Sequence, residues 1–285
     1  MKQMKLKKGS IEYQFAVESI KYFVNTRIQR YVLKQIFRQF KTKTKSEYRE
    51  DKKKTAEIWI NERKLDAKKT LIIEVNDDFS IIEDSKLNSK SLMLKYFEHR
   101  VQDSEYTDTI NTLNILIESL EEEINISSWA HSCFKSLTNK NLIKLMDPEF
   151  FDEYQKDEFD LSYHQLIQYQ LSLIQYIAEK NVFYENIIIL LDLLEIDEMI
   201  LSGIKNLKNC ISIVFVDDYK EFMPLGSICL IENRKIYDFS DEDLLYRIVT
   251  KKHKEFYTIE EAKNKMKQEL YRLKKIGIVN DSDNE

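Results

Sequence analysis

Glycine is scarce in this chain of 285 residues, which contains only Gly9, Gly203, Gly226 and Gly277. A Walker A loop and a G-x-G-x-x-G fingerprint both need closely spaced glycines, because the backbone must approach phosphate groups there. No two of the four glycines have that spacing. The sequence therefore excludes the two usual loops that bind a nucleotide through its phosphates.

Cysteine and histidine are also few. The three cysteines (Cys133, Cys210 and Cys229) are odd in number and scattered, as expected for reduced thiols in a cytoplasmic protein rather than a disulfide framework. The four histidines form neither H-E-x-x-H nor an i, i+4 pair, and there is no C-x-x-C, which argues against a zinc site. No serine lies in G-x-S-x-G, so the nucleophile elbow of a hydrolase is absent.

Long hydrophobic runs are missing as well. No run approaches the eighteen apolar residues of a transmembrane helix, and no apolar segment with a cleavage site follows the basic start MKQMKLKKGS. The chain is 43% hydrophobic and 33% charged, which is enough for a core and for solubility. We therefore expect a cytoplasmic protein without a membrane partner.

Positive charge is concentrated at one end of the chain. Residues 1–54 contain sixteen Lys or Arg against five Asp or Glu, a net charge of +11. Because the whole chain has a net charge of −5, the remaining residues have a net charge of −16. This imbalance indicates that the basic end binds a polyanion, packs on the acidic part of its own chain or a neighbour's, or forms a solvated extension.

Residues 11–45 are predicted to be helical. Within them, basic residues recur at spacings of three and four and so share one helical face; we call them the basic stripe, which comprises Arg27, Arg30, Lys34, Arg38 and Lys41. Such a helix could dock on protein while presenting charge to phosphates or anionic lipid, or its charged face could simply be solvated. Residues 41–54, with Lys52, Lys53 and Lys54, are predicted to form a linker.

The centre of the prediction is a βαβ unit in residues 184–218. Two short apolar runs, 187–191 and 211–216, lack alternation, which is typical of strands covered on both faces of a sheet. Between them, apolar residues recur at spacings of three and four, as in a crossover helix.

The other elements complete an α/β prediction. Residues 57–60, 71–75 and 227–232 are predicted strands, and helices are predicted around 110–124, 129–180, 242–256 and 258–276, the last with a Thr258–Glu261 capping box. The fold is predicted to be a sheet-based head with the central βαβ unit, interrupted by an inserted α-helical leg subdomain, plus a basic N-terminal helix and a helical C-terminal tail. The predicted boundaries are 1–54, 55–105, 106–180, 181–245 and 246–285. The last two helices suit packing on the head, or a helix-turn-helix-like nucleic-acid reader.

Two acidic pairs follow predicted strands: Asp77 with Asp78, and Asp217 with Asp218. Clustered carboxylates at a sheet edge suit Ca²⁺ or Mg²⁺, although strand-terminal acids are also ordinary turn formers. A metal-dependent nuclease of a defence system, using these acids, is therefore one hypothesis for function.

Several segments in order resemble the DNA-end-binding accessory protein of type II-A CRISPR spacer acquisition. They are LIIEVNDDFSII (71–82), LKYFEHR (94–100), INISSW (124–129), IQYIAEKNVFYENIIILLDLL (174–194) and CISIVFVDDYKEF (210–222). The resemblance covers roughly 57–240. The first 55 residues and the part after about 245 have no counterpart in the family pattern, and the matched region is acidic.

The resemblance implies an α/β head interrupted by a helical leg, assembled as a ring-like homotetramer. Such a ring holds double-stranded DNA, is supported by Ca²⁺, and has no nuclease activity. Its partners are the integrase and the large effector nuclease of the same system. We expect a non-enzymatic DNA-binding protein whose phosphate contacts come from the basic stripe with Lys52, Lys53 and Lys54. A scaffold whose basic helix docks on an acidic protein surface is the third hypothesis.

Overall fold

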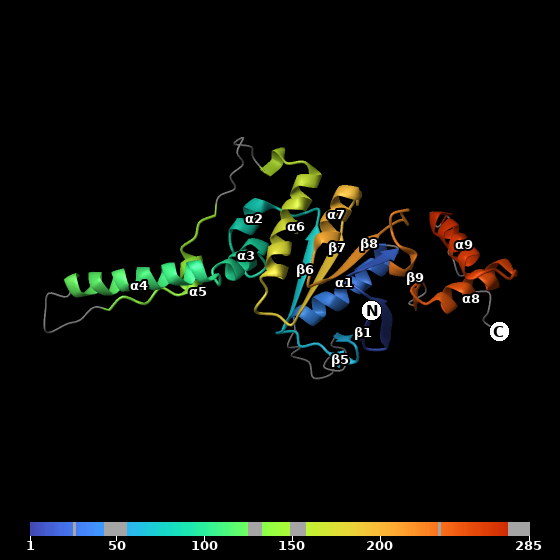
Figure 1. Cartoon of the computed structure of the whole chain (residues 1–285), viewed down its shortest axis with the longest axis horizontal. Coiled ribbons are helices and arrows are strands. Elements are labelled where there is room, and N and C mark those ends of the chain that lie inside the picture. Colours follow the sequence, from blue (N-terminus) through green and yellow to red (C-terminus); the bar gives the residue numbers. More distant parts are fainter. Residues whose placement is uncertain (25–26, 43–55, 125–132, 149–157, 233–234, 273–285) are drawn as a thin grey trace. The chain divides into compact units, whose positions relative to one another are not determined.

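The computed structural model describes residues 1–24, 27–42, 56–124, 133–148, 158–232 and 235–272 (Figure 1). The chain divides into two compact units. The first comprises Met1–Asp77, Phe183–Asp197 and Lys208–Glu285, and the second comprises Asp78–Val182 and Glu198–Leu207. Each unit is described in turn. No helix in the described ranges is both long and apolar enough to cross a membrane.

The first unit is built on a six-stranded sheet. Four strand pairs are parallel, and the edge strand β10 pairs antiparallel with its neighbour β9. In sheet order, the strands are β10 (Lys235–Asp238), β9 (Ile228–Glu232), β3 (Ile20–Val24), β8 (Ile211–Val216), β7 (Asn186–Asp192) and β6 (Thr70–Asn76).

The predicted βαβ unit is confirmed. Strand β7 and strand β8 are joined through α7 (Glu198–Asn206) and lie side by side as a parallel pair. Every side chain of β8 and the five central side chains of β7 are buried, as expected from apolar runs without alternation.

A second, four-stranded antiparallel sheet has the order β2-β1-β4-β5. Its strands are β1 (Lys2–Lys8), β2 (Ile11–Val17), β4 (Glu57–Ile60) and β5 (Arg63–Lys64). The turn between β1 and β2 contains Gly9 at φ +60°, a left-handed conformation that glycine adopts without strain. Burial alternates along β1 and β4, so one face of this sheet is covered and the other is open.

The helix predicted over residues 11–45 is wrong for residues 11–24, which form β2 and β3. The segment IEYQFAV is rich in aromatic and branched residues that favour strands, and its tertiary pairing decides the outcome. The remainder is confirmed as α1 (Arg27–Thr42). The predicted boundary at residue 54 falls inside the first unit, because β3 is an interior strand of the large sheet. The predicted linker lies largely outside the described residues.

One core joins α1 and both sheets of the first unit. Leu33, Ile36 and Phe37 of α1 are buried in the same cluster as inward side chains of β1, β4, β7 and β8. A cluster of this size, with every central member nearly inaccessible, fixes α1 against the sheets by burial of apolar area. The position of α1 determines where its basic side chains lie.

The first unit ends in two helices, α8 (Glu242–His253) and α9 (Ile259–Arg272). The predicted capping box is confirmed: Glu261 N–H donates to Thr258 Oγ1, and Thr258 N–H donates to the Glu261 carboxylate at 2.8 Å. Lys252 of α8 pairs with Glu269 of α9 at 2.6 Å, and Tyr271 contacts Tyr219. The contact with Tyr219, which follows β8, matches the prediction that the helices pack on the head. The predicted C-cap Gly277 lies outside the described residues.

In its described part the second unit contains helices and irregular segments but no strand, which confirms the predicted helical insertion. The helix predicted over 129–180 is wrong for residues 133–138, which are irregular. The unit begins at Asp78, before the predicted residue 106, and residues 92–97 lie within one of its helices. Its elements besides α7 are α2 (Ile81–Ser85), α3 (Leu92–Arg100), α4 (Ser104–Ile124), α5 (Asn139–Lys144), a 3-10 turn (Glu158–Asp160) and α6 (Tyr163–Glu179).

Buried polar side chains cap the short helices of the second unit. Asp84 accepts hydrogen bonds from the backbone N–H groups of Leu92 and Met93, both at 2.7 Å, at the start of α3. Gly203 of α7 lets that helix approach α6, because a Cβ there would lie 2.9 Å from Leu171 Cδ1. These contacts hold helices that are too short to be stable alone.

Candidate functional site at the carboxyl edge of the parallel sheet

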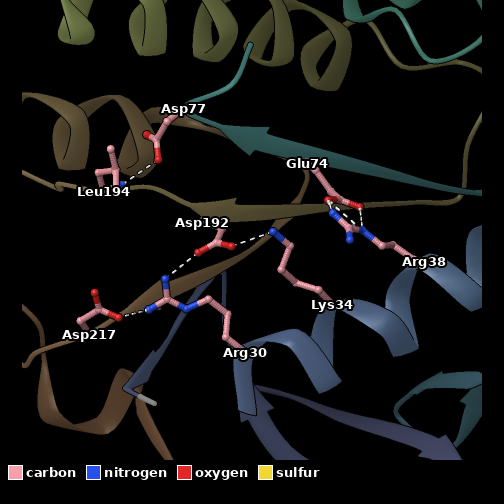
Figure 2. A network of polar contacts seen from close by, with 8 residues as sticks. All are labelled: Arg30, Lys34, Arg38, Glu74, Asp77, Asp192, Leu194 and Asp217. Carbon is pink, nitrogen blue, oxygen red and sulfur yellow. Dashed lines mark hydrogen bonds and ion pairs between the residues drawn. The ribbon is translucent and has the colours of Figure 1, made fainter. Parts of the chain in front are cut away.

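Acidic side chains gather at the carboxyl edge of the parallel sheet, where open α/β proteins usually bind ligands. Strand β7 ends in Asp192, while Asp77 and Asp217 directly follow β6 and β8. Figure 2 shows that three side chains of α1 point at this edge and at Glu74 of β6. The site is therefore a meeting of the basic stripe with the acidic strand ends.

Asp192 is held by two cations at once. Arg30 Nη1 donates to its Oδ1 at 2.6 Å, and Lys34 Nζ donates to its Oδ2 at 2.6 Å. Arg30 also bridges to Asp217, with 2.5 Å between Nη2 and Oδ1. The side chains of Arg30 and Lys34 are only 11% and 15% exposed, so solvent screens these charges poorly.

Farther along α1, Arg38 forms a bidentate ion pair with Glu74. Its Nε lies 2.9 Å from Oε1 and its Nη2 lies 2.6 Å from Oε2. This fork geometry is specific to guanidinium and carboxylate groups. Lys41 follows one turn later and donates to the backbone carbonyl of Ile72 at 3.1 Å. The stripe thus runs along β6 and β7 through successive polar contacts.

The pKa values reflect this pairing. Burial opposes ionisation of Glu74, but the hydrogen bonds and charge of Arg38 outweigh it and lower the pKa of that carboxyl. Burial likewise opposes ionisation of Asp192, and its contacts with Lys34 and Arg30 lower its pKa nonetheless. The hydrogen bond to Glu74 raises the pKa of Arg38. All three groups are therefore charged in the folded protein at neutral pH.

The basic stripe packs on the acidic part of its own chain, one of the alternatives left open by the charge imbalance. Four of its five members, Arg30, Lys34, Arg38 and Lys41, have partners within the first unit. The side chain of Arg27 and all of Lys52, Lys53 and Lys54 lie outside the described part of the chain. DNA contact by the stripe stays a prediction, and DNA would have to compete with these internal carboxylates.

The structure does not gather the predicted metal ligands into one group. Asp217 binds Arg30, and Asp77 Oδ2 accepts a hydrogen bond from Leu194 N–H at 3.0 Å (Figure 2). A hydrogen bond to the backbone, like that of Asp77, is common for an acid in a turn. Among the described residues, no three His, Cys, Asp or Glu side chains are placed to hold a metal ion. Metal binding by Asp77, Asp78, Asp217 or Asp218 is thus still only a prediction.

A hollow of about 120 Å³ lies next to this network. It is lined by residues 193–196 and 215–218 together with Lys220 and Met223. Pockets for drug-sized ligands are usually about 300–1,000 Å³, so this one is too small for a nucleotide. Asp217, which lines this hollow, is also the carboxylate that pairs with Arg30.

Sequence reasoning missed the two acids that matter most here, Asp192 and Glu74. A signal for both was present, because Glu74 is the single charge within the apolar run LIIEV and Asp192 ends the run IIILLD. A lone acid in or at the end of a buried strand needs a nearby cation or donors. The spacing of the basic stripe identified the cations but not these partners.

We predict that Asp192→Asn lowers the free energy of unfolding at pH 7 by about 2 kcal/mol, because two charge-assisted hydrogen bonds are weakened. The folded-state pKa of Asp192 is lowered, so its contribution is present above the unfolded value of about 4 and is lost as pH falls below it. Urea unfolding between pH 3.5 and 7 should show a difference that shrinks toward the acid end. Asp217→Asn is the matched control: its side chain is 59% exposed, and its effect should stay below about 1 kcal/mol. A pH-independent difference for Asp192→Asn would contradict the assignment.

The fold and the site define an α/β protein whose sheet unit is interrupted by a helical unit and whose strand edge is closed by ion pairs. No family model matches this chain, and no curated protein matches its sequence. Among solved structures, the chain is similar to the crystal structure of Stu0660 of Streptococcus thermophilus, with a TM-score of 0.63 and 15% sequence identity. The likeness covers 90% of this chain and 82% of that chain. At this identity it shows a shared fold.

Proposed function

We propose that this protein binds double-stranded DNA ends without cleaving them and acts in CRISPR spacer acquisition as a ring-like homo-oligomer. The observation that carries the proposal is the path of the chain. It leaves the parallel sheet after β6, forms a helical unit over Asp78–Val182, and returns to the sheet as β7. The family resemblance of residues 57–240 implies this same organisation. The likeness to Stu0660 supports the path over most of the chain.

Self-assembly is supported by an apolar seam on α4. Four side chains at spacings of three and four share one face of this 21-residue helix, and each is well exposed: Leu113 (38%), Leu116 (59%), Leu120 (47%) and Ile124 (50%). Scattered exposed leucines are ordinary, but a continuous seam is typical of a helix that packs on another helix. We assign this seam to a second copy of the chain.

DNA binding is proposed to rest on phosphate contacts, which are independent of sequence and weakened by salt. Within the basic stripe, Arg38 is the best placed, because its side chain is 44% exposed whereas Arg30 and Lys34 are nearly buried. We therefore propose that Arg38 and the run Lys52–Lys54 make these contacts. Ca²⁺ is proposed to support the assembly, and the integrase and the large effector nuclease are the proposed protein partners.

The proposal is tested by titrating a labelled linear duplex in 50 mM and 200 mM salt, with and without Ca²⁺, and measuring fluorescence anisotropy. We expect binding that weakens steeply with salt. The triple variant Lys52→Gln, Lys53→Gln and Lys54→Gln should bind more weakly and with a shallower salt dependence. The matched control replaces three exposed lysines of the second unit, Lys135, Lys140 and Lys144, with glutamine.

Three other outcomes would contradict the proposal. Absence of binding in 50 mM salt would leave the scaffold hypothesis. Cleavage with Mg²⁺ that Asp217→Ala abolishes would establish the nuclease. A loss of binding confined to the control triple would move the contacts to the second unit. Deleting residues 1–54 is not a usable test, because it removes the interior strand β3 together with α1.

A further inference from the structure

The four-stranded sheet presents an open polar face. Strand registry places Gln14 of β2, Lys5 of β1, Trp59 of β4 and Lys64 of β5 side by side in one row across it. The alternate residues of β1 and β4 point into the core and are buried, among them Met4, Leu6 and Ile58. Trp59 is therefore half-buried within its sheet but faces outward.

A hollow of about 460 Å³ lies on this face. It is lined by Gln3, Lys5, Gln14, Trp59, Asn61 and Glu62. This volume is within the usual range of about 300–1,000 Å³ for small-molecule sites. It is nearly four times the volume of the hollow at the carboxyl edge of the parallel sheet.

The rim of the hollow is fixed by its own backbone. Asn61 and Glu62 form a tight turn with φ of 48° and 64°, the left-handed conformation of the hairpin turns that match strand twist. Gln3 N–H donates to Asn61 Oδ1 and Asn61 N–H donates to Gln3 O, both at 2.8 Å. Within the described ranges, the side-chain amides of Gln3 and Gln14 form no hydrogen bond. Two amides thus face a preformed hollow with their donors and acceptors free for a ligand.

The two lysines near Trp59 are each paired with a carboxylate, but both pairs are exposed and weak. Lys5 pairs with Glu12 at 2.6 Å, and Lys64 pairs with Glu57 while its Nζ lies 6.0 Å from the centre of the Trp59 ring. Both lysines are more than one-third exposed, and such surface pairs are worth only about 0–1 kcal/mol. A phosphate can therefore attract either lysine at little cost.

We propose that this hollow binds an unpaired nucleobase. The base stacks on Trp59, its polar edge exchanges hydrogen bonds with the amides of Gln3 and Gln14, and Lys5 or Lys64 contacts the attached phosphate. Bases inside a duplex are stacked and unavailable, so the ligand is a free nucleotide or the unpaired end of a strand. The site goes beyond the proposed duplex binding and does not depend on it. A neutral sugar also stacks on tryptophan, but two lysines flanking the ring favour a phosphate-bearing ligand.

The test uses the chain's two tryptophans, Trp59 and Trp129. In the Trp129→Phe variant, Trp59 is the single tryptophan and reports directly on the hollow. We expect saturable quenching of its fluorescence by AMP and by a ten-nucleotide oligo(dA). We expect no quenching by a blunt hairpin duplex or by maltose. Saturation by AMP alone would identify a free-nucleotide site, whereas tighter binding of oligo(dA) would identify strand ends. Quenching by maltose alone, or by none of the four probes, would overturn the proposal.

A second measurement removes the contacts themselves. Anisotropy of labelled oligo(dA) should show about tenfold weaker binding for Trp59→Ala, the typical effect of losing one stacked base. The double variant Gln3→Ala with Gln14→Ala should also bind more weakly, while Lys2→Ala, on the same strand but outside the hollow, should bind normally. Circular dichroism checks that each variant is folded. Unchanged binding in folded Trp59→Ala would overturn the site even if duplex binding holds.

Discussion

Asp238→Asn is expected to destabilise the first unit by about 3–5 kcal/mol, because it leaves the ammonium group of Lys21 buried without a countercharge. The side chain of Lys21 is only 1% exposed; its Nζ lies 2.6 Å from Asp238 Oδ1 and donates to Gly226 O at 3.1 Å. Asp238 Oδ2 also accepts a hydrogen bond from Ala16 N–H at 2.6 Å. One carboxylate thus joins β10 and β3 of the large sheet to β2 of the small sheet.

A double-mutant cycle separates this charge effect from simple loss of packing. Lys21→Met removes the buried cation, so adding Asp238→Asn to it should cost much less than Asp238→Asn alone. Urea unfolding followed by circular dichroism gives all four stabilities. An additive cycle, or a loss below about 1 kcal/mol for Asp238→Asn, would show that the pair does not hold the two sheets together.

Replacing Leu116 and Leu120 with lysine is expected to convert the proposed oligomer into monomers. Both side chains belong to the exposed seam of α4, and two ammonium groups placed in a helix–helix interface would be buried without partners. Size-exclusion chromatography with light scattering measures the mass directly. The change should leave the circular dichroism spectrum intact, since both positions are exposed within the single chain.

The control variant carries Glu118→Lys and Glu122→Lys, two positions roughly half a turn away on the same helix. It introduces a larger change in charge but leaves the seam intact, so the oligomer should persist. If both variants dissociate, charge and not the seam governs assembly. If the wild-type chain is itself monomeric at micromolar concentration, with and without Ca²⁺, the assignment of the seam to a second copy is wrong.

The parts of the fold that were predictable from sequence are those with strong local signals. Uninterrupted branched runs identified β7 and β8, and the Thr258–Glu261 box marked the start of α9. Residues 11–24 were missed because their pattern admits either element, and the choice is made by pairing with distant strands. Strand β3 pairs with β8 and β9, which lie about two hundred residues farther along the chain.

The candidate site was also only partly predictable from the sequence. Spacing alone placed Arg30, Lys34 and Arg38 on one helical face, and the structure agrees. What that face meets is decided by tertiary packing, which brings α1 against β6 and β7 and supplies Glu74 and Asp192 as partners. The open face around Trp59 was equally invisible, because it depends on the pairing of β1 with β4 across more than fifty residues.

The most direct test of the proposed function compares a linear duplex with a covalently closed circle of the same sequence. Both are titrated with the wild-type chain in Ca²⁺, and the complexes are resolved by gel shift, with light scattering on the same samples. A ring that binds DNA ends should retard the linear duplex, leave the closed circle free, and leave both DNAs uncut. Equal binding of the circle, cleavage of either DNA, or a monomer that binds neither would contradict the proposal.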